Sequence, residues 1–417
     1  MKVYLRTFGC RANHYDTEAV RAMIESQGYD VVASPDHADV AVFNSCAVTS
    51  EAEAELRKVV RRVSREGPHL RSVVMGCAAA LDADRPPALR IASLPSVEHV
   101  VPGADLAAVA RALELAPDAF TTIATAQPAT RALLRIQDGC DEHCTFCATT
   151  LARGANRSRA ADDIVREARA LAERHPEIVI TGIHIGTYGA DTGSSLGALM
   201  QRLVRDVPTV RFRLSSIEAS EIDDALTELL VGAADRLAPH VHAPLQSGSD
   251  AVLKRMGRHW YTSITYARAV DALAGRMPVL GLGADVITGF PGETEEDHAA
   301  TISLLQRLPF TYLHVFPFSL RPGTAAERLS GHVQPSVATR RAAEVRSLAA
   351  RKSAAYRSTR VGGRADVVVI GRGADREGVT GDYLTVALNR ADFEPGQRFA
   401  GRLEPSPDGR LQAMLLE

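Results

Sequence analysis

Apolar and polar positions alternate along the first 117 residues in a way that predicts strands separated by helices. Short apolar runs such as Val3–Phe8 and Val40–Phe43 alternate with amphipathic stretches such as Thr17–Gln27 and Ser50–Glu66. Strands that alternate with helices favour a parallel sheet covered by helices. Residues 1–117 are therefore expected to form an open parallel α/β domain.

Two further regions follow a stretch rich in Ala, Thr and Pro, residues 118–130, which is predicted to be a linker. Residues 131–357 contain six apolar runs separated by helical patterns, which predicts an incomplete TIM-like barrel of (β/α)6 type. In residues 358–417, four or five short strands alternate with Gly and Asp turns, as expected of a small β-barrel. The six runs predicted as barrel strands are Leu133–Gln137, Ile178–Gly182, Phe212–Ser216, His240–Leu245, Leu280–Thr288 and Tyr312–Phe318.

Composition narrows the cellular setting. The chain has 417 residues, 46% of them hydrophobic, and a net charge of −2, so no global charge attracts nucleic acid. Its first apolar stretch is interrupted by Arg6 and has no cleavage-site pattern, and no run of 18 apolar residues occurs. A cytoplasmic protein without a membrane span is expected. In a reducing compartment, its six cysteines are expected to be metal ligands or catalytic groups rather than disulfides.

Three of the cysteines lie close together on the loop after the first predicted barrel strand. Cys140, Cys144 and Cys147 have C-x3-C-x2-C spacing, with Phe146 just before the third. An iron–sulfur cubane normally takes four cysteines, so three would leave one iron open for a substrate. The alternative is a structural zinc knuckle, which would need His143, between two cysteines, as its fourth ligand.

The other three cysteines, Cys10, Cys46 and Cys77, each follow a predicted strand of the first domain. The carboxyl ends of parallel strands meet at one rim, so these thiols are expected to converge on a second cluster with an open iron. Gly9 and Gly76 would let the backbone approach such a ligand closely. The alternative is that each cysteine is a small buried residue at a strand end.

The C-x3-C-x2-C segment resembles the cluster loop of radical S-adenosylmethionine enzymes, and the whole chain resembles their methylthiotransferases. That resemblance implies two 4Fe-4S clusters, S-adenosylmethionine, and transfer of a methylthio group to C2 of a modified adenosine. The tail resembles the RNA-binding TRAM domain of that family. The matching segments are Gly9–Glu18, Cys46–Thr49, Arg153–Gly154, Arg157–Arg159 and, in the tail, Gly378–Leu384.

Three segments, Gly182–Gly189, Ser215–Glu218 and Leu245–Asp250, are similar to the branch that acts on N6-threonylcarbamoyladenosine beside the tRNA anticodon. This resemblance implies two partners, the anticodon stem-loop of tRNA and an electron donor such as a flavodoxin or ferredoxin. Neither DNA nor a membrane is expected as a partner. Two alternatives stay open: the same chemistry on isopentenyladenosine or a ribosomal-protein aspartate, or a non-catalytic iron–sulfur or zinc RNA-binding module.

Further site residues are expected around the clusters and on basic helices. Phe146, Gly182, Ser216 and Glu218 are predicted to contact S-adenosylmethionine, and no catalytic residue beyond the cluster ligands is expected. A second basic helix face, within Ser50–Glu66, is more typical of solvated surface. The residues predicted to contact RNA phosphates, on a dense basic run next to the tail, are Arg351, Lys352, Arg357, Arg360 and Arg364.

Overall fold

The computed structural model describes residues 1–47, 50–116, 126–371, 373, 376–390 and 392–416. The N-terminal region is a five-stranded parallel sheet with strand order β2-β1-β3-β4-β5. The predicted open α/β domain is thus confirmed as a fold, and the stretch predicted as a linker falls largely in residues that are not described. The strands are β1 Lys2–Thr7, β2 Asp30–Val32, β3 Val40–Ser45, β4 Arg71–Gly76 and β5 Val97–Pro102.

Helices cover both faces of this sheet because each has one apolar side. The apolar sides of α1 and α4 pack on one face of the sheet, and the apolar side of α2 packs on the opposite face. Helix α1 begins six residues before the predicted Thr17, because its first turns bury the polar residues Asn13 and Asp16, which give no apolar periodicity. The helices are α1 Arg11–Ser26, α2 Ser50–Glu66, α3 Cys77–Ala80 and α4 Leu106–Ala112.

The central region is an incomplete parallel barrel, as predicted from the sequence. Its strands form two three-stranded sheets, ordered β10-β9-β6 and β11-β12-β13, which meet through isolated bridges such as Ser216–His242. All six predicted strands are present, and a short antiparallel pair, β7 Gln137–Asp138 and β8 Arg157–Ser158, flanks the first. The barrel strands are β6 Ala132–Arg135, β9 Glu177–Thr181, β10 Arg211–Leu214, β11 His240–His242, β12 Gly281–Thr288 and β13 Tyr312–Pro317.

Helices surround the barrel strands and bury a continuous apolar core against them. The last helix, α12, continues to Arg360, so the domain boundary predicted at residue 357 falls inside its final turn. None of the helices in the described part of the chain is both long enough and apolar enough to cross a membrane. The helices are α5 Thr149–Arg153, α6 Ala161–Ala172, α7 Leu196–Asp206, α8 Asp224–Gly232, α9 Asp250–Arg255, α10 Ser263–Arg276, α11 Glu295–Arg307 and α12 Pro335–Arg360.

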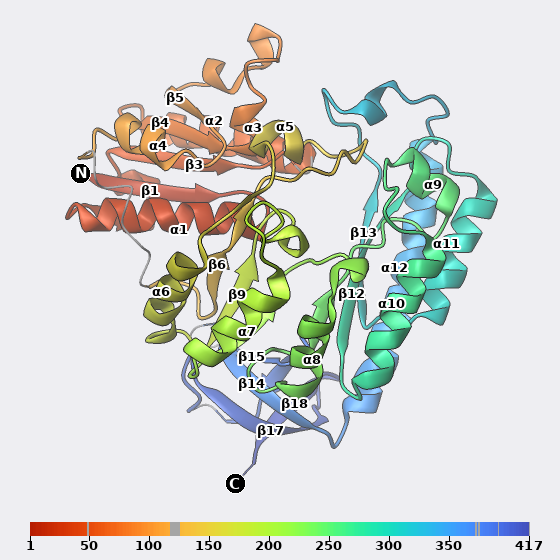
Figure 1. The fold of residues 1–417 in the computed structure, drawn as a ribbon. Helices are drawn as coiled ribbons and strands as arrows, with labels where there is room; N and C mark the ends of the chain where they lie inside the picture. Colours follow the sequence, from red (N-terminus) through yellow and green to blue (C-terminus); the bar gives the residue numbers. More distant parts are fainter. Residues whose placement is uncertain (48–49, 117–125, 372, 374–375, 391, 417) are drawn as a thin grey trace.

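The tail is a closed five-stranded barrel with strand order β14-β15-β16-β18-β17. In Figure 1 it lies at the opposite end of the central barrel from the N-terminal sheet. Buried arginines of β10 dock it: Arg211 lies 2.8 Å from the carboxylate of Asp366, and Arg213 donates to the Gly381 carbonyl at 2.9 Å. The strands are β14 Arg364–Ile370, β15 Glu377–Thr380, β16 Thr385–Leu388, β17 Arg398–Pro405 and β18 Leu411–Leu415.

Candidate active site

Three free thiols lie on the loop that leaves the first barrel strand. Cys140, Cys144 and Cys147 are half-buried and line a cavity of about 560 Å³. The Cys140 amide donates to the Gly154 carbonyl at 3.0 Å, which ties the start of the loop to the end of α5. The loop therefore presents its sulfurs to open space at the carboxyl end of the barrel, where chemistry is expected in this kind of fold.

Each of these sulfurs has a polar neighbour. Arg258 donates to the sulfur of Cys144 at 3.4 Å, the Thr149 amide donates to that of Cys147 at 3.3 Å, and His184 lies 3.5 Å from that of Cys140. Burial raises the pKa of the Cys144 thiol to about 12, against the opposing effect of Arg258. Hydrogen-bond donors beside a thiolate sulfur partly offset its negative charge. Such donors are expected around cysteines that bind a metal or a metal cluster.

The geometry favours a cluster over a single zinc ion. Among the described residues, only His242, Asp285 and His314 place three candidate ligand atoms within 4.8 Å of one another, and neither set of three cysteines is that compact. A tetrahedral zinc ion needs ligand atoms packed about one point, whereas a cubane spreads its sulfur ligands over several irons. His143, which the zinc alternative requires, is exposed.

The residues predicted to contact S-adenosylmethionine divide into two groups. Phe146, Ser216 and Glu218 line a second cavity, of about 170 Å³, together with the loop cysteines. Gly182 is not part of that lining: a Cβ there would lie 2.9 Å from the carbonyl and the side-chain oxygen of Gln137. Its missing side chain makes room for Gln137, which accepts hydrogen bonds from the amides of Ile183 and His184.

The other three cysteines converge at the rim of the N-terminal sheet, as the sequence predicts. The sulfurs of Cys10 and Cys77 each lie 3.8 Å from the side-chain oxygen of Asn13. Gly9 has φ +98°, and a Cβ there would lie 2.4 Å from the sulfur of Cys46. Burial raises the pKa of the Cys77 thiol to about 11, and Cys10 and Cys46 add to this rise, so the three thiols are electrostatic neighbours.

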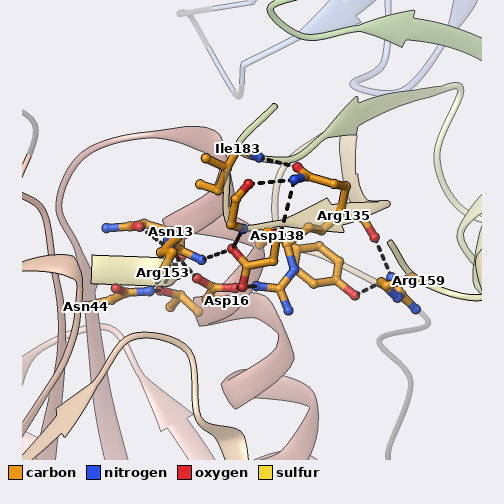
Figure 2. Close-up of polar contacts among 12 residues, drawn as sticks. Asn13, Asp16, Asn44, Arg135, Asp138, Arg153, Arg159 and Ile183 are labelled. Carbon is orange, nitrogen blue, oxygen red and sulfur yellow. Dashed lines mark hydrogen bonds and ion pairs between the residues drawn. The ribbon is translucent and has the colours of Figure 1, made fainter. Parts of the chain in front are cut away.

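A buried arginine joins this second set of cysteines to the barrel. Arg153, whose side chain is 1% exposed, donates to the sulfur of Cys77 at 3.3 Å. It also donates to the side chains of Asn13 and Asp16, both at 2.7 Å, and to Asp138 at 3.0 Å (Figure 2). Asp138 lies two residues before Cys140, so one guanidinium group contacts residues adjoining both sets of thiols.

A small cavity, of about 100 Å³, has cysteines of both sets in its walls. Cys77 of the N-terminal set and Cys147 of the loop set line it, together with Phe146 and Arg321. We call it the intercluster cavity. A substrate placed here would lie within reach of both sets of thiols, which is the arrangement needed to join two chemical steps on one atom. The remaining residues that line it are Ala47, Ala148 and Thr149.

The basic run predicted to bind RNA is only partly exposed. Arg351, Arg357 and Arg364 face solvent, whereas Lys352 is half-buried and donates to the Gln306 carbonyl at 2.9 Å. Arg360 is buried and donates to the carboxylate of Asp382 at 2.8 Å. The prediction for Arg360 is therefore wrong, because its guanidinium group fastens α12 to the tail barrel.

Four polar residues of the site were not identified from the sequence. Arg153 belongs to a segment that carries the family resemblance, but no local pattern assigns it to Cys77. Arg258, His184 and Arg321 are far in sequence from the cysteines that they approach. Only their spacing in the folded chain brings them to the site.

Comparison with known protein families covers the first two regions. The family described as uncharacterized protein family UPF0004 matches residues 2–91, and the radical SAM superfamily matches residues 134–305. Among solved structures, a radical S-adenosylmethionine methyltransferase, TsrM, from Kitasatospora setae has a TM-score of 0.57 at 14% identity, over 78% of this chain and 76% of that one. At this identity the likeness concerns the fold alone.

Curated relatives are similar over most of their length. The chain is 38% identical to the threonylcarbamoyladenosine tRNA methylthiotransferase MtaB of Bacillus subtilis, over 81% of this chain and 78% of the relative. It is 34% identical to the protein of the same name from Thermotoga maritima, over 86% and 84%. A tRNA-2-methylthio-N6-dimethylallyladenosine synthase of Jannaschia is 32% identical, over 88% and 83%.

Proposed function

Because this chain belongs to the radical S-adenosylmethionine methylthiotransferase family, we propose that it adds a methylthio group to C2 of N6-threonylcarbamoyladenosine beside the tRNA anticodon. S-adenosylmethionine and a 4Fe-4S cluster are cofactors of this family. The observation that carries the proposal is the intercluster cavity, because it brings one substrate position against cysteines of both sets. The first relatives named above, at 34–38% identity, support the threonylcarbamoyl substrate.

The six cysteines fit two clusters. Cys140, Cys144 and Cys147 would hold the cluster shared with the radical superfamily, and the N-terminal set would hold an auxiliary one. When bound, the clusters supply the one-electron chemistry and the sulfur that substitution of an unactivated aromatic C–H requires. An external donor such as a flavodoxin or ferredoxin would deliver the electron. The N-terminal set comprises Cys10, Cys46 and Cys77.

The protein's own groups orient the reactants and keep water away. Phe146 packs edge-to-face against Phe290, with ring centres 6.3 Å apart. Its ring forms an apolar wall shared by the cavity of about 170 Å³ and the intercluster cavity. The carboxylate of Glu218 is buried and ion-paired with Arg258, so both are held in place beside Cys144. Fixed groups of this kind lower the cost of bringing the reacting atoms together.

The tail barrel and α12 are proposed to bind the tRNA stem-loop. Arg351, Arg357 and Arg364 provide exposed positive charge where α12 enters the tail barrel. Contacts to phosphates fix the register of an RNA without reading its sequence. The choice of nucleotide would then be made at the intercluster cavity.

The decisive experiment is anaerobic reconstitution of the wild type and of a Cys10/Cys46/Cys77→Ala triple variant, with iron and sulfide counted. We expect about eight irons in the wild type and about four in the variant. The variant should still cleave S-adenosylmethionine but form no methylthio product. About four irons in both proteins would show that the N-terminal cysteines hold no cluster, and the proposed transfer would be withdrawn.

Substrate choice is tested by mass spectrometry of nucleosides after reaction. The wild type is offered stem-loops that carry either N6-threonylcarbamoyladenosine or N6-dimethylallyladenosine, and a ribosomal protein is offered separately. Product on the threonylcarbamoyl stem-loop alone supports the proposal. Product mainly on the dimethylallyl stem-loop would transfer the assignment to the branch of the Jannaschia relative.

A further inference from the structure

A basic pocket adjoins the intercluster cavity. Neither a cysteine nor a residue of the tail barrel lines it, so the roles proposed above assign it no function. Its volume is about 390 Å³, and its charged lining residues are Arg57, Arg85, Arg321 and Glu53. We call it the arginine pocket. It shares Ala47, Ala148 and Arg321 with the lining of the intercluster cavity, so the two spaces are neighbours with a common wall.

The arginines of the pocket are held in place rather than mobile. Arg57 on α2 donates to Glu53 at 3.1 Å, and Arg85 donates to the other oxygen of the same carboxylate at 2.5 Å. The side chains of Arg57 and Arg85 are each 16% exposed. Arg321 is half-buried and donates to the hydroxyl of Ser319 at 2.8 Å. These contacts pre-order the guanidinium groups, which lowers the entropic cost of binding a ligand.

The charges of the pocket do not balance. Three guanidinium groups and one carboxylate line it. Glu51, outside the lining, attracts Arg321 as Glu53 does, so the three arginines outnumber the two carboxylates around the pocket by one. A concave, partly buried site with excess positive charge favours binding of an oxyanion, because guanidinium groups match the geometry of carboxylates and phosphates.

The position of the pocket indicates whose oxyanion it receives. In the proposed reaction C2 of the target adenine lies in the intercluster cavity, because Cys77 of one set and Cys147 of the other line it. A neighbouring pocket with a shared wall is then in reach of groups attached to that same nucleotide. Two such groups are anionic: the carboxylate of the threonylcarbamoyl side chain and the backbone phosphate.

We propose that the arginine pocket binds an anionic group of the target nucleotide, with Arg321 as the residue that spans both spaces. This inference rests on the proposed function, since it assumes that the adenosine occupies the intercluster cavity. It makes Arg321 a substrate-positioning residue. The carboxylate and the phosphate share the same recognition chemistry, and the choice between them is an outcome of the test.

The test measures RNA binding by the reconstituted full-length protein with fluorescence anisotropy over a range of salt concentrations. One synthetic stem-loop carries N6-threonylcarbamoyladenosine, and a second carries the same side chain without its carboxylate. The variants are Arg321→Gln, which removes the charge, and Arg321→Lys, which keeps it. Arg307→Gln on α11 is the control, because it removes the positive charge of a surface arginine that pairs with Asp271 and lines neither the arginine pocket nor the intercluster cavity. Arg85→Gln serves as a second charge deletion if Arg321→Gln fails to fold.

Two results support the inference and distinguish the sources of the anion. If the carboxylate is bound, Arg321→Gln weakens binding of the threonylcarbamoyl stem-loop about tenfold and leaves the second stem-loop unaffected. If a phosphate is bound, both stem-loops lose affinity, and the slope of log K against log salt falls by about 0.7. In either case Arg321→Lys restores part of the affinity, and Arg307→Gln behaves like the wild type.

Two other results overturn it, for different reasons. Wild-type affinity of Arg321→Gln for both stem-loops would remove the pocket from substrate recognition while leaving the proposed function intact. Failure of the wild type itself to bind either stem-loop would instead overturn the proposed function, and the inference with it.

Discussion

At the scale of single residues, the contact between Arg153 and Cys77 predicts an effect on the auxiliary cluster proposed at the N-terminal cysteines. A positive donor beside a ligating sulfur stabilises the more negative, reduced state and so raises the reduction potential. Arg153→Gln should lower the midpoint potential by on the order of 60 mV, equivalent to about 1.4 kcal/mol for one electron. The measurement is a redox titration followed by electron paramagnetic resonance, in a Cys140/Cys144/Cys147→Ala background that keeps only the auxiliary cluster.

Arg135→Gln is the matched control for this prediction. Arg135 pairs with Asp16 and Asp138, as Arg153 does, but no contact with a cysteine is seen among its described interactions. The Arg153→Lys variant should give an intermediate potential. Equal potentials in the Gln variants of Arg153 and Arg135 would mean that Arg153 acts only by joining the domains.

Gly9 gives a second prediction at this scale. A Cβ at this position would meet the sulfur of Cys46, and the residue has φ +98°. Gly9→Ala should cost on the order of 1–3 kcal/mol in backbone strain and displace Cys46, so the iron count should fall by about four. Gly28→Ala is the control, because Gly28 has φ +74° with nothing within 4 Å of its Cβ position. An unchanged iron count in Gly9→Ala would show that the site adjusts around the added methyl group.

The sequence indicates candidate cluster ligands more readily than the residues around them. Cys140, Cys144 and Cys147 are recognisable because all three lie within eight residues, and the N-terminal cysteines because each ends a strand. Arg258 reaches Cys144 across 114 positions, and no local pattern records such a contact. The prediction for Arg360 failed for a related reason: a basic helix does not reveal which of its faces another domain will cover.

At the scale of elements, the strands were the most predictable part of the fold. Strands buried on both faces of a parallel sheet are mostly apolar, as in the first four residues of β3, so their positions can be read from the sequence. The start of α1 could not be predicted from apolar periodicity, because its first turns bury the polar residues Asn13 and Asp16. In the tail, β15 is hard to predict as a strand, because valine is the only large apolar residue among its four, Glu377–Thr380.

The strands β9 and β10 lead to a prediction about pH. Burial alone would raise the pKa of Glu177, but attraction to Arg213 and Arg211 outweighs burial and lowers it below its usual range. A lowered folded-state pKa means that this stabilisation is complete above the unfolded value near 4.3 and is lost as pH falls through the folded value. Glu177→Gln should destabilise the protein by about 3–5 kcal/mol at pH 7, since it leaves buried guanidinium groups unpaired.

Thermal unfolding of the wild type and of Glu177→Gln between pH 3 and pH 8 checks this. The gap between the two melting temperatures should be widest near neutrality and should narrow below about pH 4. Glu228→Gln, which breaks the exposed pair with Arg276, should change stability by less than about 1 kcal/mol. A gap that stays constant with pH would show that Glu177 contributes by packing rather than by charge.

At the scale of the whole molecule, the N-terminal sheet region and the central barrel carry the cysteines, and the tail barrel is proposed to bind the RNA. Deleting the tail is a poor test of that proposal, because it would expose Arg211 and Arg213, which are buried against the tail barrel. Neutralising the exposed basic residues avoids this difficulty. The combined variant replaces Arg351, Arg357 and Arg364 with Gln.

This triple variant should bind the tRNA stem-loop at least tenfold more weakly at low salt, and the salt slope should fall by up to about two. Binding is measured by anisotropy, and iron content and S-adenosylmethionine cleavage should match those of the wild type. An unchanged salt slope would mean that the RNA lies elsewhere, and the proposed role of α12 and the tail barrel would be dropped.

Tyr383 of the tail barrel touches all three domains. Its hydroxyl accepts a hydrogen bond from Arg11 of α1 at 3.0 Å, its ring lies under the guanidinium group of Arg213, and the ring of His240 is 4.5 Å away. If a tail from a distant relative replaced this one, the residue at the position of Tyr383 would face Arg11, Arg213 and His240, which need not suit it. The three domains are best regarded as co-adapted parts, so exchanging tails between substrate branches requires α1 and β10 to be exchanged as well.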